Sequence, residues 1–217
     1  MNDSTSLAEE FGDIDIYLFD QLLRGRVRRG MRVVDAGCGG GRNLVYLLRR
    51  AATREIEVFG RDADSNAIAA VRRLAASIAP DSAPDKFRTE KVEEMTFGDE
   101  FADVVISSAV LHFASSEDQF LAMLNEMWRV LKPGGLFFCR LASSIGIENQ
   151  VRHVSGHRYA LPDGSERYLV DAATLRELTE RLGAQFADPL KTTVVQDQRS
   201  MTTWVLRKHG SGSNGGP

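Results

Sequence analysis

One stretch of the chain decides the fold, Val33-Val34-Asp35-Ala36-Gly37-Cys38-Gly39-Gly40-Gly41-Arg42-Asn43. A short apolar run reaches an acidic residue and then a cluster of glycines, and a helical pattern follows. This order predicts a buried strand, a tight turn and the start of a helix. Such a turn brings backbone N–H groups and a helix N-terminus against a ligand. Because Asp35 would repel a diphosphate, we expect the ligand to carry an ammonium or sulfonium group.

The glycine spacing separates two classes of cofactor. A dinucleotide site uses Gly-x-Gly-x-x-Gly, in which the last glycine lets the helix pack closely against the strand. Arg42 stands at that last position, so an NAD(P)-dependent oxidoreductase is the weaker alternative. The pattern Asp-x-Gly-x-Gly-x-Gly from Asp35 to Gly41 instead resembles motif I of class I S-adenosylmethionine (SAM) methyltransferases.

The composition indicates one globular domain. The chain has 217 residues, of which 43% are hydrophobic, and this is enough for a single sizeable core. We expect one domain over residues 1–208 and a flexible tail at 209–217, where glycine and serine dominate. The net charge of −3 and the lack of a basic block argue against a nucleic-acid partner.

Cysteine content and hydropathy indicate the cellular compartment in which the protein is expected to work. Cys38 and Cys139 are the only cysteines, and they form neither a disulfide framework nor a metal-ligand spacing. No apolar run reaches the length of a membrane span, and the polar, acidic N-terminus is unlike a signal peptide. The sequence therefore predicts a cytoplasmic protein without a membrane partner.

Strands and helices alternate along most of the chain, which predicts a parallel sheet covered on both faces. The expected strands are 33–36, 56–60, 87–92, 103–107, 136–141, 190–195 and 202–207, and the expected helices are 14–24, 43–50, 65–78, 117–131 and 171–183. Ser65 and Asp171 are expected to cap their helices. The predicted fold class is α/β, a Rossmann-like doubly wound seven-stranded sheet, mostly parallel with an antiparallel C-terminal strand. A parallel sheet that ends in one antiparallel hairpin is also the class I methyltransferase arrangement.

Two segments lie outside this alternation. Residues 1–30 are expected to form a helical lid, with the first ten residues mobile. Residues 143–157 lack clear periodicity, and the segments 158–161 and 166–170 flank the turn signal Pro162-Asp163-Gly164-Ser165. We therefore expect 143–170 to be an insertion with a hairpin on the substrate side.

The resemblance extends over residues 30 to 142. Its further matches are Gly60-Arg61-Asp62, Glu93-Glu94-Met95-Thr96-Phe97, the segment from Ser107 to Phe113, and Trp128-Arg129-Val130-Leu131-Lys132-Pro133-Gly134-Gly135. It implies SAM as cofactor, with Asp62 on the ribose and Asp64 as its rival or as a helix cap. The family's adenine-binding Asp is absent, so Glu93 takes that role or is loop charge. The implied cofactor-binding residues are Asp35, Gly37, Cys38, Gly39, Gly41, Asp62, Ala63, Val92, Glu93 and Ser108.

The sequence assigns no catalytic residue. Methyl transfer from a sulfonium is an in-line displacement, so alignment can suffice unless the acceptor must lose a proton. The candidate bases are His112, His153 and His157. His153 and His157 are four residues apart, but the residues between them favour a helix poorly, so no metal site is expected.

The acceptor is expected to be a small molecule that is anionic or polar. The segment Gly41-Arg42-Asn43 is similar to motif I of tellurite-resistance-type methyltransferases, which hints at small-molecule or oxyanion substrates. The expected insertion is locally basic through Arg152, His153, His157, Arg158 and Arg167, although for any single one of them the sequence favours hairpin surface charge. The resemblance thus implies a SAM-dependent methyltransferase. A protein that binds SAM or its demethylated product without catalysis is the alternative.

Overall fold

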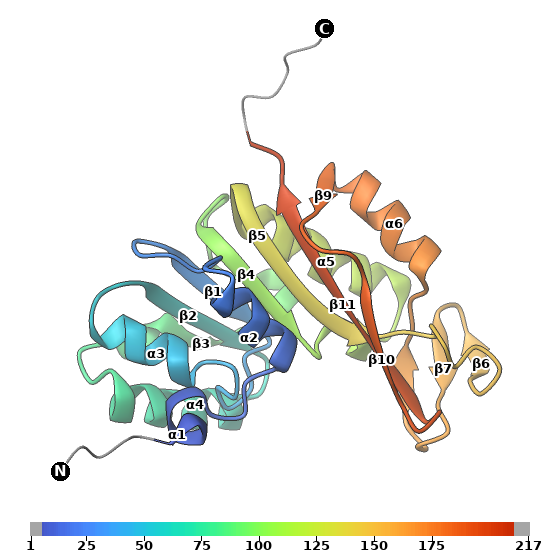
Figure 1. The fold of residues 1–217 in the computed structure, drawn as a ribbon, viewed down its shortest axis with the longest axis horizontal. Helices are drawn as coiled ribbons and strands as arrows, with labels where there is room; N and C mark the ends of the chain where they lie inside the picture. The colour runs from blue at the N-terminus through green and yellow to red at the C-terminus, as the bar shows by residue number, and fades with distance from the viewer. Residues whose placement is uncertain (1–5, 211–217) are drawn as a thin grey trace, which may run out of the picture.

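The structure is built on a twisted sheet with the strand order β10-β11-β5-β4-β1-β2-β3 (Figure 1). The computed structural model describes residues 6–210. The strands of this path are β1 (Arg32–Ala36), β2 (Glu57–Asp62), β3 (Phe87–Thr89), β4 (Ala102–Ser108), β5 (Leu131–Ala142), β10 (Lys191–Val195) and β11 (Arg199–Lys208). The first five are parallel to one another, and β11 is antiparallel to β5 and to β10. The predicted mostly parallel sheet with an antiparallel C-terminal strand is confirmed.

Alternate side chains of the central strands enter two different cores. Val33 and Val104 belong to the core under α2 (Ile16–Leu23), α3 (Val45–Ala52) and α4 (Ser65–Ile78). Val34 and Val105 belong to the core under α5 (Glu117–Val130) and α6 (Ala172–Arg181). Figure 1 shows α2 and α3 in front of the sheet and α5 behind it. Because both faces are covered, these strands read as continuous apolar runs, and this is why they were predictable.

Helix ends follow capping chemistry, with one correction. Asp171 caps α6 as predicted, since its side chain accepts a hydrogen bond from the N–H of Thr174 at 2.7 Å. The prediction that Ser65 caps α4 was wrong, because Ser65 is the first helical residue. Asp64 is the cap, with an extended backbone and a side chain that accepts from the N–H of Asn66 at 2.8 Å.

The third strand is shorter than expected. Residues 87–92 were predicted as one strand, but β3 ends at Thr89, and residues 92–94 form the short 3-10 helix η2 (Val92–Glu94). The buried Val92 packs into the core under α5 instead of continuing the sheet. The carboxylate of Glu90 accepts hydrogen bonds from Arg61 at 2.8 Å and from the Thr96 hydroxyl at 2.6 Å. These contacts fix the turn that ends the strand.

The short elements α1 (Leu7–Phe11) and β9 (Ala184–Phe186) were among those not predicted. The helix α1 begins at Ser6, which forms a capping box with Glu9, so residues 6–10 are ordered where mobility was expected. The rest of that expectation, residues 1–5, lies outside the described residues, as does 211–217 of the expected tail. The strand β9 pairs with β11 as an eighth strand beside the predicted seven. No helix among residues 6–210 has the length and apolar character needed to cross a membrane.

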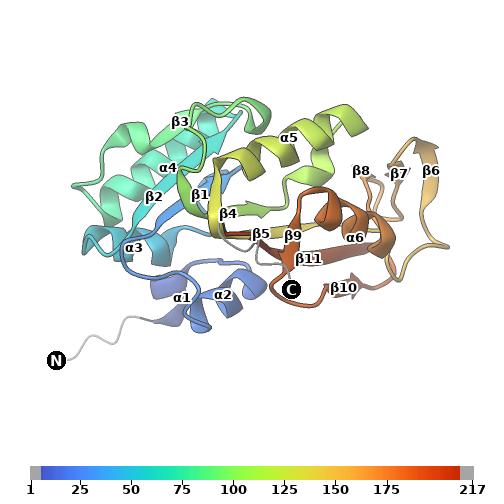
Figure 2. The same cartoon turned by 90° about the horizontal axis from the view of Figure 1, so that it is seen from above.

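The insertion at 143–170 forms a small separate sheet. The predicted hairpin is confirmed as β7 (Arg158–Ala160) and β8 (Glu166–Tyr168), and β6 (Arg152–Ser155) adds a third antiparallel strand. All residues of β6 are exposed, which explains why the sequence showed no periodicity there. Figure 2 shows this sheet at one end of the molecule and β3 at the other.

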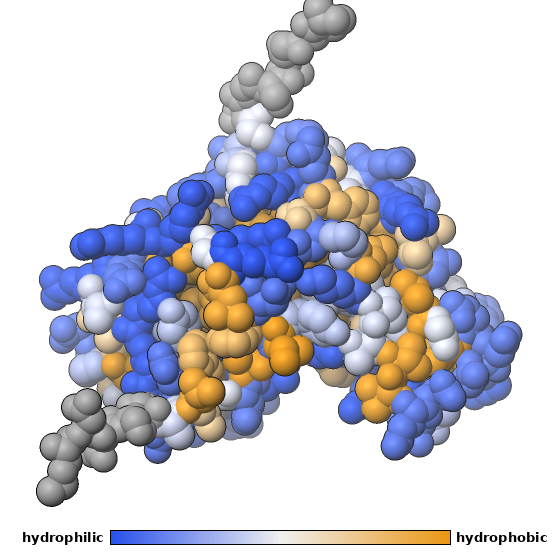
Figure 3. All heavy atoms as spheres, viewed as in Figure 1, coloured by the Kyte–Doolittle hydropathy of each residue, from blue (hydrophilic) through white to orange (hydrophobic). Residues whose placement is uncertain are grey.

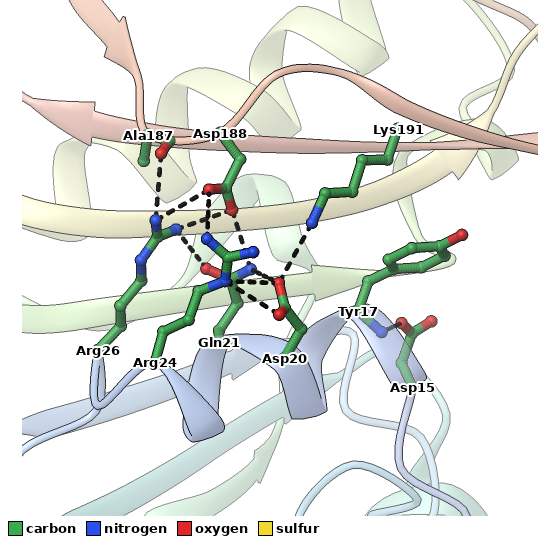
Figure 4. A network of polar contacts seen from close by, with 9 residues as sticks. All are labelled: Asp15, Tyr17, Asp20, Gln21, Arg24, Arg26, Ala187, Asp188 and Lys191. Atoms are coloured by element: carbon green, nitrogen blue, oxygen red, sulfur yellow. Dashed lines mark hydrogen bonds and ion pairs between the residues drawn. The ribbon is translucent and has the colours of Figure 1, made fainter.

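A polar network ties α2 to the segment before β10 (Figure 4). The Asp188 carboxylate, 6% exposed, accepts from the Arg26 guanidinium at 2.8 and 2.9 Å and from Gln21 Nε2 at 3.0 Å. Burial pushes the pKa of Asp188 upward, but these hydrogen bonds and the nearby arginine charges outweigh it and hold the pKa below its usual value. Asp20 pairs with Lys191 at 3.2 Å on the outer side of the same contact. The N-terminal helical segment is thereby fixed to the C-terminal edge of the sheet.

Candidate functional site

The glycine turn after β1 is fixed by backbone conformation and by close packing. Gly37 and Gly41 have φ values of +82° and +89°, which favour glycine. A Cβ atom at Gly37 would collide with Val110, and one at Gly41 would lie 2.8 Å from side-chain atoms of both Val71 and Leu74. The turn therefore needs glycine at both positions, and it presents bare backbone at the carboxyl edge of the sheet.

Asp35 is a buried carboxylate without a partner. It is 1% exposed, and neither of its side-chain oxygens has a hydrogen-bond partner. Burial, helped by the charge of Asp62 and opposed by that of Arg42, raises its pKa to about 7. An unpaired buried charge is costly, so a cationic group placed against Asp35 would be strongly favoured.

Asp62 links the end of β2 to the glycine turn. Its Oδ2 accepts a hydrogen bond from the N–H of Gly39 at 2.8 Å, and its Oδ1 accepts from the N–H of Asp64 at 2.9 Å. Each carboxylate oxygen has a second lone pair, so Asp62 can still accept from a ligand. Asp64 is occupied as the cap of α4 and is exposed. Of the two rivals, Asp62 is the one directed to the turn.

A cavity of about 670 Å³ lies between the ends of β2 and β4 and η2. It brings together five of the predicted cofactor residues, namely Gly37, Asp62, Ala63, Val92 and Glu93. Glu93 accepts a hydrogen bond from Gln119 Nε2 at 3.0 Å. The apolar side chains of Met123 and Phe113 form another part of the cavity wall. This volume is in the range of small-molecule and cofactor sites.

A second cavity, of about 510 Å³, lies on the other side of the same turn. Gly37 and Ala109 line both cavities. The second one contains the predicted residues Gly37, Cys38, Gly39 and Ser108, together with His112. The Ser108 hydroxyl accepts a hydrogen bond from Arg42 at 3.4 Å. Burial raises the pKa of the Cys38 thiol, so this cysteine stays protonated.

The structure separates the three candidate bases. The His112 ring is buried, and its Nδ1 accepts a hydrogen bond from the N–H of Ala142 at 3.1 Å. Burial, together with the charges of Arg167 and Arg140, lowers the pKa of His112 to about 4. The neutral ring then carries its proton on Nε2 and is a donor, not a base.

The other two histidines lie outside both cavities. The Nε2 atom of His153 lies 3.0 Å from the Gly156 carbonyl oxygen on the exposed rim of the small sheet. His157 stacks on Tyr168 with ring centroids 5.1 Å apart. Within the described range, no cluster of three or more His, Cys, Asp or Glu side chains could hold a metal ion.

Sequence reasoning missed most of the charged wall of the second cavity. Four arginines line it, Arg42, Arg140, Arg167 and Arg199. Of the basic residues predicted in the insertion, only Arg167 is among them. Arg152 and Arg199 are both exposed, but only Arg199 borders the cavity, and Arg158 pairs with Glu166 at 2.7 Å. Arg140 carried a signal, because a charge near the end of an apolar strand is unusual. Arg199 had none, because charge in a hairpin turn ordinarily faces solvent.

Comparison with known proteins identifies the type of domain. Residues 34–139 match the family model described as a methyltransferase domain. A Ubiquinone biosynthesis O-methyltransferase of Brucella anthropi is 30% identical over 173 residues, which are 76% of this chain and 64% of that protein. The chain thus spans about 64% of the length of this curated relative.

Two solved structures share the fold. A SAM-dependent methyltransferase of Methanosarcina mazei has a TM-score of 0.66 at 18% identity, covering 88% of this chain and 98% of that one. The 1,6-didemethyltoxoflavin-N1-methyltransferase of Burkholderia thailandensis, solved with 1,6-didemethyltoxoflavin and S-adenosylhomocysteine, has a TM-score of 0.65 at 20% identity, covering 88% and 76%.

The matched segment and the sheet order together define a Rossmann-like methyltransferase domain. Residues 34–139 thus form a methyltransferase domain, and its match and fold are consistent with the class I SAM-dependent methyltransferases that the glycine turn resembles.

Proposed function

We propose that the protein binds SAM across the two cavities and transfers its methyl group to a small-molecule acceptor. The observation that carries this proposal is the buried, unpartnered carboxylate of Asp35 beside the glycine turn. SAM bears an ammonium and a sulfonium group, and either would satisfy that charge. A diphosphate would not, which disfavours the dinucleotide alternative.

The two cavities divide the contacts proposed for the cofactor. In the larger cavity, Asp62 would accept from the ribose hydroxyls, and Ala63, Val92 and Glu93 would border the adenine. In the smaller cavity and its wall, Ser108 would face the methionine end. The remaining proposed contacts come from the turn itself, Gly37, Cys38, Gly39 and Gly41. The shared wall at Gly37 supports one ligand that crosses from one cavity to the other.

Alignment is the main catalytic contribution that this site can make. SAM supplies an activated methyl group, and holding an acceptor in line with it can lower the barrier by about 7–11 kcal/mol at most. His112 would donate a hydrogen bond from Nε2 to the acceptor molecule. Without a free histidine base in the cavity wall, the site suits an acceptor atom that is already nucleophilic or easily ionised.

The acceptor is proposed to reach the smaller cavity. The insertion supplies Leu161, Asp163, Ser165 and Arg167 to its wall, which supports a substrate-side role for residues 143–170. The net charge of −3 and the cavity volume of about 510 Å³ favour a small molecule over nucleic acid. The named Brucella relative is an O-methyltransferase, so oxygen is the first acceptor atom to test. The tellurite-type similarity at the turn stays a prediction.

We also propose that residues 1–208 act as one domain and that the N-terminal helices close one side of the smaller cavity. Asp15, at the start of α2, accepts from Arg140 Nη1 at 3.0 Å, and Arg140 lines that cavity. The N–H of Asp15 donates to Asn43 Oδ1 at 2.9 Å. These bonds support a fixed cover over the end of the glycine turn.

Calorimetry with SAM, S-adenosylhomocysteine and NAD⁺ tests the cofactor. SAM and its demethylated product are expected to bind and NAD⁺ is not, and the reverse result would overturn the proposal. Asp62→Ala is expected to weaken SAM binding by about 2 kcal/mol or more, through loss of charge-assisted hydrogen bonds. Asp64→Ala is the matched control, and its SAM affinity should stay within threefold. Labelled-methyl transfer to a small-molecule extract then separates an enzyme from a protein that only binds SAM.

A further inference from the structure

We infer that the acceptor carries an anionic oxygen group, and that Arg167 and Arg199 bind this group in the smaller cavity. This inference rests on the proposed function and names the substrate class for the same site. It is carried by four arginines that line one cavity in a protein with a net charge of −3.

The fold brings these two arginines to the cavity from distant parts of the chain. β11 is antiparallel to β5 and pairs Met201 with Ala142, so Arg199 lies at the carboxyl edge of the sheet. The insertion returns to that edge through a bridge between Ser143 and Val170 and a hydrogen bond of 2.9 Å from the Ser144 N–H to the Val170 carbonyl. Figure 3 shows the surface hollowed between the N-terminal part and the lobe of the small sheet.

The other two arginines of the cavity already have neighbours that account for their charge. Arg140 is paired with the buried Asp15 at 3.0 Å. Arg42 donates to Ser108 at 3.4 Å, and its charge acts on Asp35, so it belongs to the cofactor end of the cavity. A cofactor carboxylate would be a sufficient partner for Arg42.

Within residues 6–210, Arg167 and Arg199 form no ion pair. The pKa of Asp163 in the same cavity is lowered mainly by hydrogen bonds from Ser165, and the charges of both arginines contribute to this lowering. In the described part of the chain, no carboxylate lies within 4.0 Å of either guanidinium. Arg167 is held over the Phe113 ring at 4.9 Å and donates from Nη1 to the Glu166 carbonyl at 2.8 Å, so its direction is set. Asp163 lines the same cavity, but its Oδ1 accepts from both the N–H and the hydroxyl of Ser165 at 2.9 and 2.6 Å.

This arrangement suits an oxyanion better than a neutral polar group. A guanidinium presents planar N–H pairs that match a carboxylate or a phosphate, and such charge-assisted bonds are about twice as strong as neutral ones. The buried His112 adds a neutral donor to the same wall. A cavity of about 510 Å³ can hold a small molecule that bears the anionic group. The opposite arrangement holds on the rim of the insertion, where Arg158 is neutralised by Glu166.

The test compares three probes with one ring and different head groups, benzoate, phenyl phosphate and benzyl alcohol. Each is titrated by calorimetry into the full chain saturated with S-adenosylhomocysteine. We expect at least one anionic probe to bind tenfold or more tightly than benzyl alcohol, and the preferred head group separates carboxylate from phosphate. In the double variant Arg167→Gln/Arg199→Gln, the ratio of the affinity for the anionic probe to that for benzyl alcohol should fall at least tenfold. Arg152→Gln removes an exposed charge of the same insertion and should change it less than twofold.

Each outcome of these titrations either supports or overturns the inference that Arg167 and Arg199 bind an anionic group. Equal affinity for the three probes, no binding of any of them, a preserved preference in the double variant, or an equal loss in Arg152→Gln would overturn the inference. The affinity of the double variant for S-adenosylhomocysteine should stay within twofold, which also shows that the variant folds. If the wild-type chain does not bind S-adenosylhomocysteine, the proposed function fails, and the anion preference is then measured on the protein alone.

Discussion

The two cavities share the wall formed by Gly37 and Ala109, but they differ in charge. The larger one is lined by Asp62, Asp64 and Glu93 against a single lysine. The smaller one is lined by four arginines against a single aspartate. A ligand that crosses the shared wall therefore passes from a carboxylate-rich environment to a guanidinium-rich one.

The origin of the charges explains the difference. Asp62 ends β2, Asp64 follows that strand and Glu93 lies in η2, all within the segment that matches the methyltransferase family. Arg167 and Arg199 lie in the insertion and at the start of β11, outside that segment. The carboxylate side thus lies within the matched segment and these two arginines lie outside it, as expected where function is a site grafted onto a fold.

The largest expected effect is on the carboxylate side, for Asp35→Asn. The substitution keeps the shape of the side chain and removes the charge that a SAM cation would meet. Loss of one partner of a buried charge pair costs about 2–5 kcal/mol, so SAM affinity at pH 8 should fall at least thirtyfold. Calorimetry measures this, and an unchanged affinity would contradict the role of Asp35.

The pH dependence of Asp35→Asn checks the same prediction independently. The folded-state pKa of Asp35 is raised to about 7 by burial, while the unfolded value is about 4. Cofactor-free protein should therefore lose stability as pH rises from about 4 through 7, whereas SAM affinity should rise about tenfold from pH 6 to pH 8. In Asp35→Asn both slopes should flatten. The neutral variant should also unfold no more readily than wild type at pH 8, which separates lost binding from lost structure.

The next largest effect is expected for Asp188→Ala, which tests how α2 is held beside the smaller, arginine-lined cavity. This change leaves the largely buried Arg26 without its partner, and breaking a buried pair from one side costs about 3 kcal/mol. Urea unfolding measures the loss. Because the folded pKa of Asp188 is lowered, the stability it adds is present above about pH 4 and disappears below it.

Asp20→Ala, on α2 in the same polar network, is the matched control (Figure 4). Asp20 is about a third exposed and pairs with exposed cations, so its loss should cost less than about 1 kcal/mol. SAM affinity of Asp188→Ala should stay within threefold of wild type, because no part of this network touches the larger cavity. Equal destabilisation by the two variants would mean that α2 is held by its apolar face alone.

The carboxylate side was predictable from sequence because its signals are local. Gly37 and Gly41 need positive φ, and Asp35 and Asp62 sit at fixed offsets from buried strands. The strands themselves read as apolar runs because both of their faces are buried. Resemblance to the family added the roles that spacing alone left open.

The arginine side was not predictable because it depends on long-range pairing. Arg199 reaches the cavity only through the register of β11 on β5, and no local pattern encodes that register. His112 is a donor because it accepts from Ala142, thirty residues away in the chain. β6 is exposed along its whole length and so carries no alternation. The misplaced cap at Ser65 arose because two adjacent residues can both cap, and Asp64 has the extended backbone.

The smallest effect tests the shared wall itself, by comparing Gly37→Ala with Gly39→Ala. Both positions have positive φ, +82° and +52°, so alanine is strained at each by about 1 kcal/mol. At Gly39 a Cβ meets nothing within 4 Å, whereas at Gly37 it collides with Val110, and such overpacking adds about 1–3 kcal/mol. We therefore expect Gly37→Ala to lose about 2 kcal/mol more stability in urea unfolding. Adding Val110→Ala should recover part of that difference at Gly37 and none at Gly39. Equal losses of stability in the two variants would mean that Val110 moves aside for the added methyl group. The close contact between Gly37 and Val110 would then not limit the passage between the two cavities.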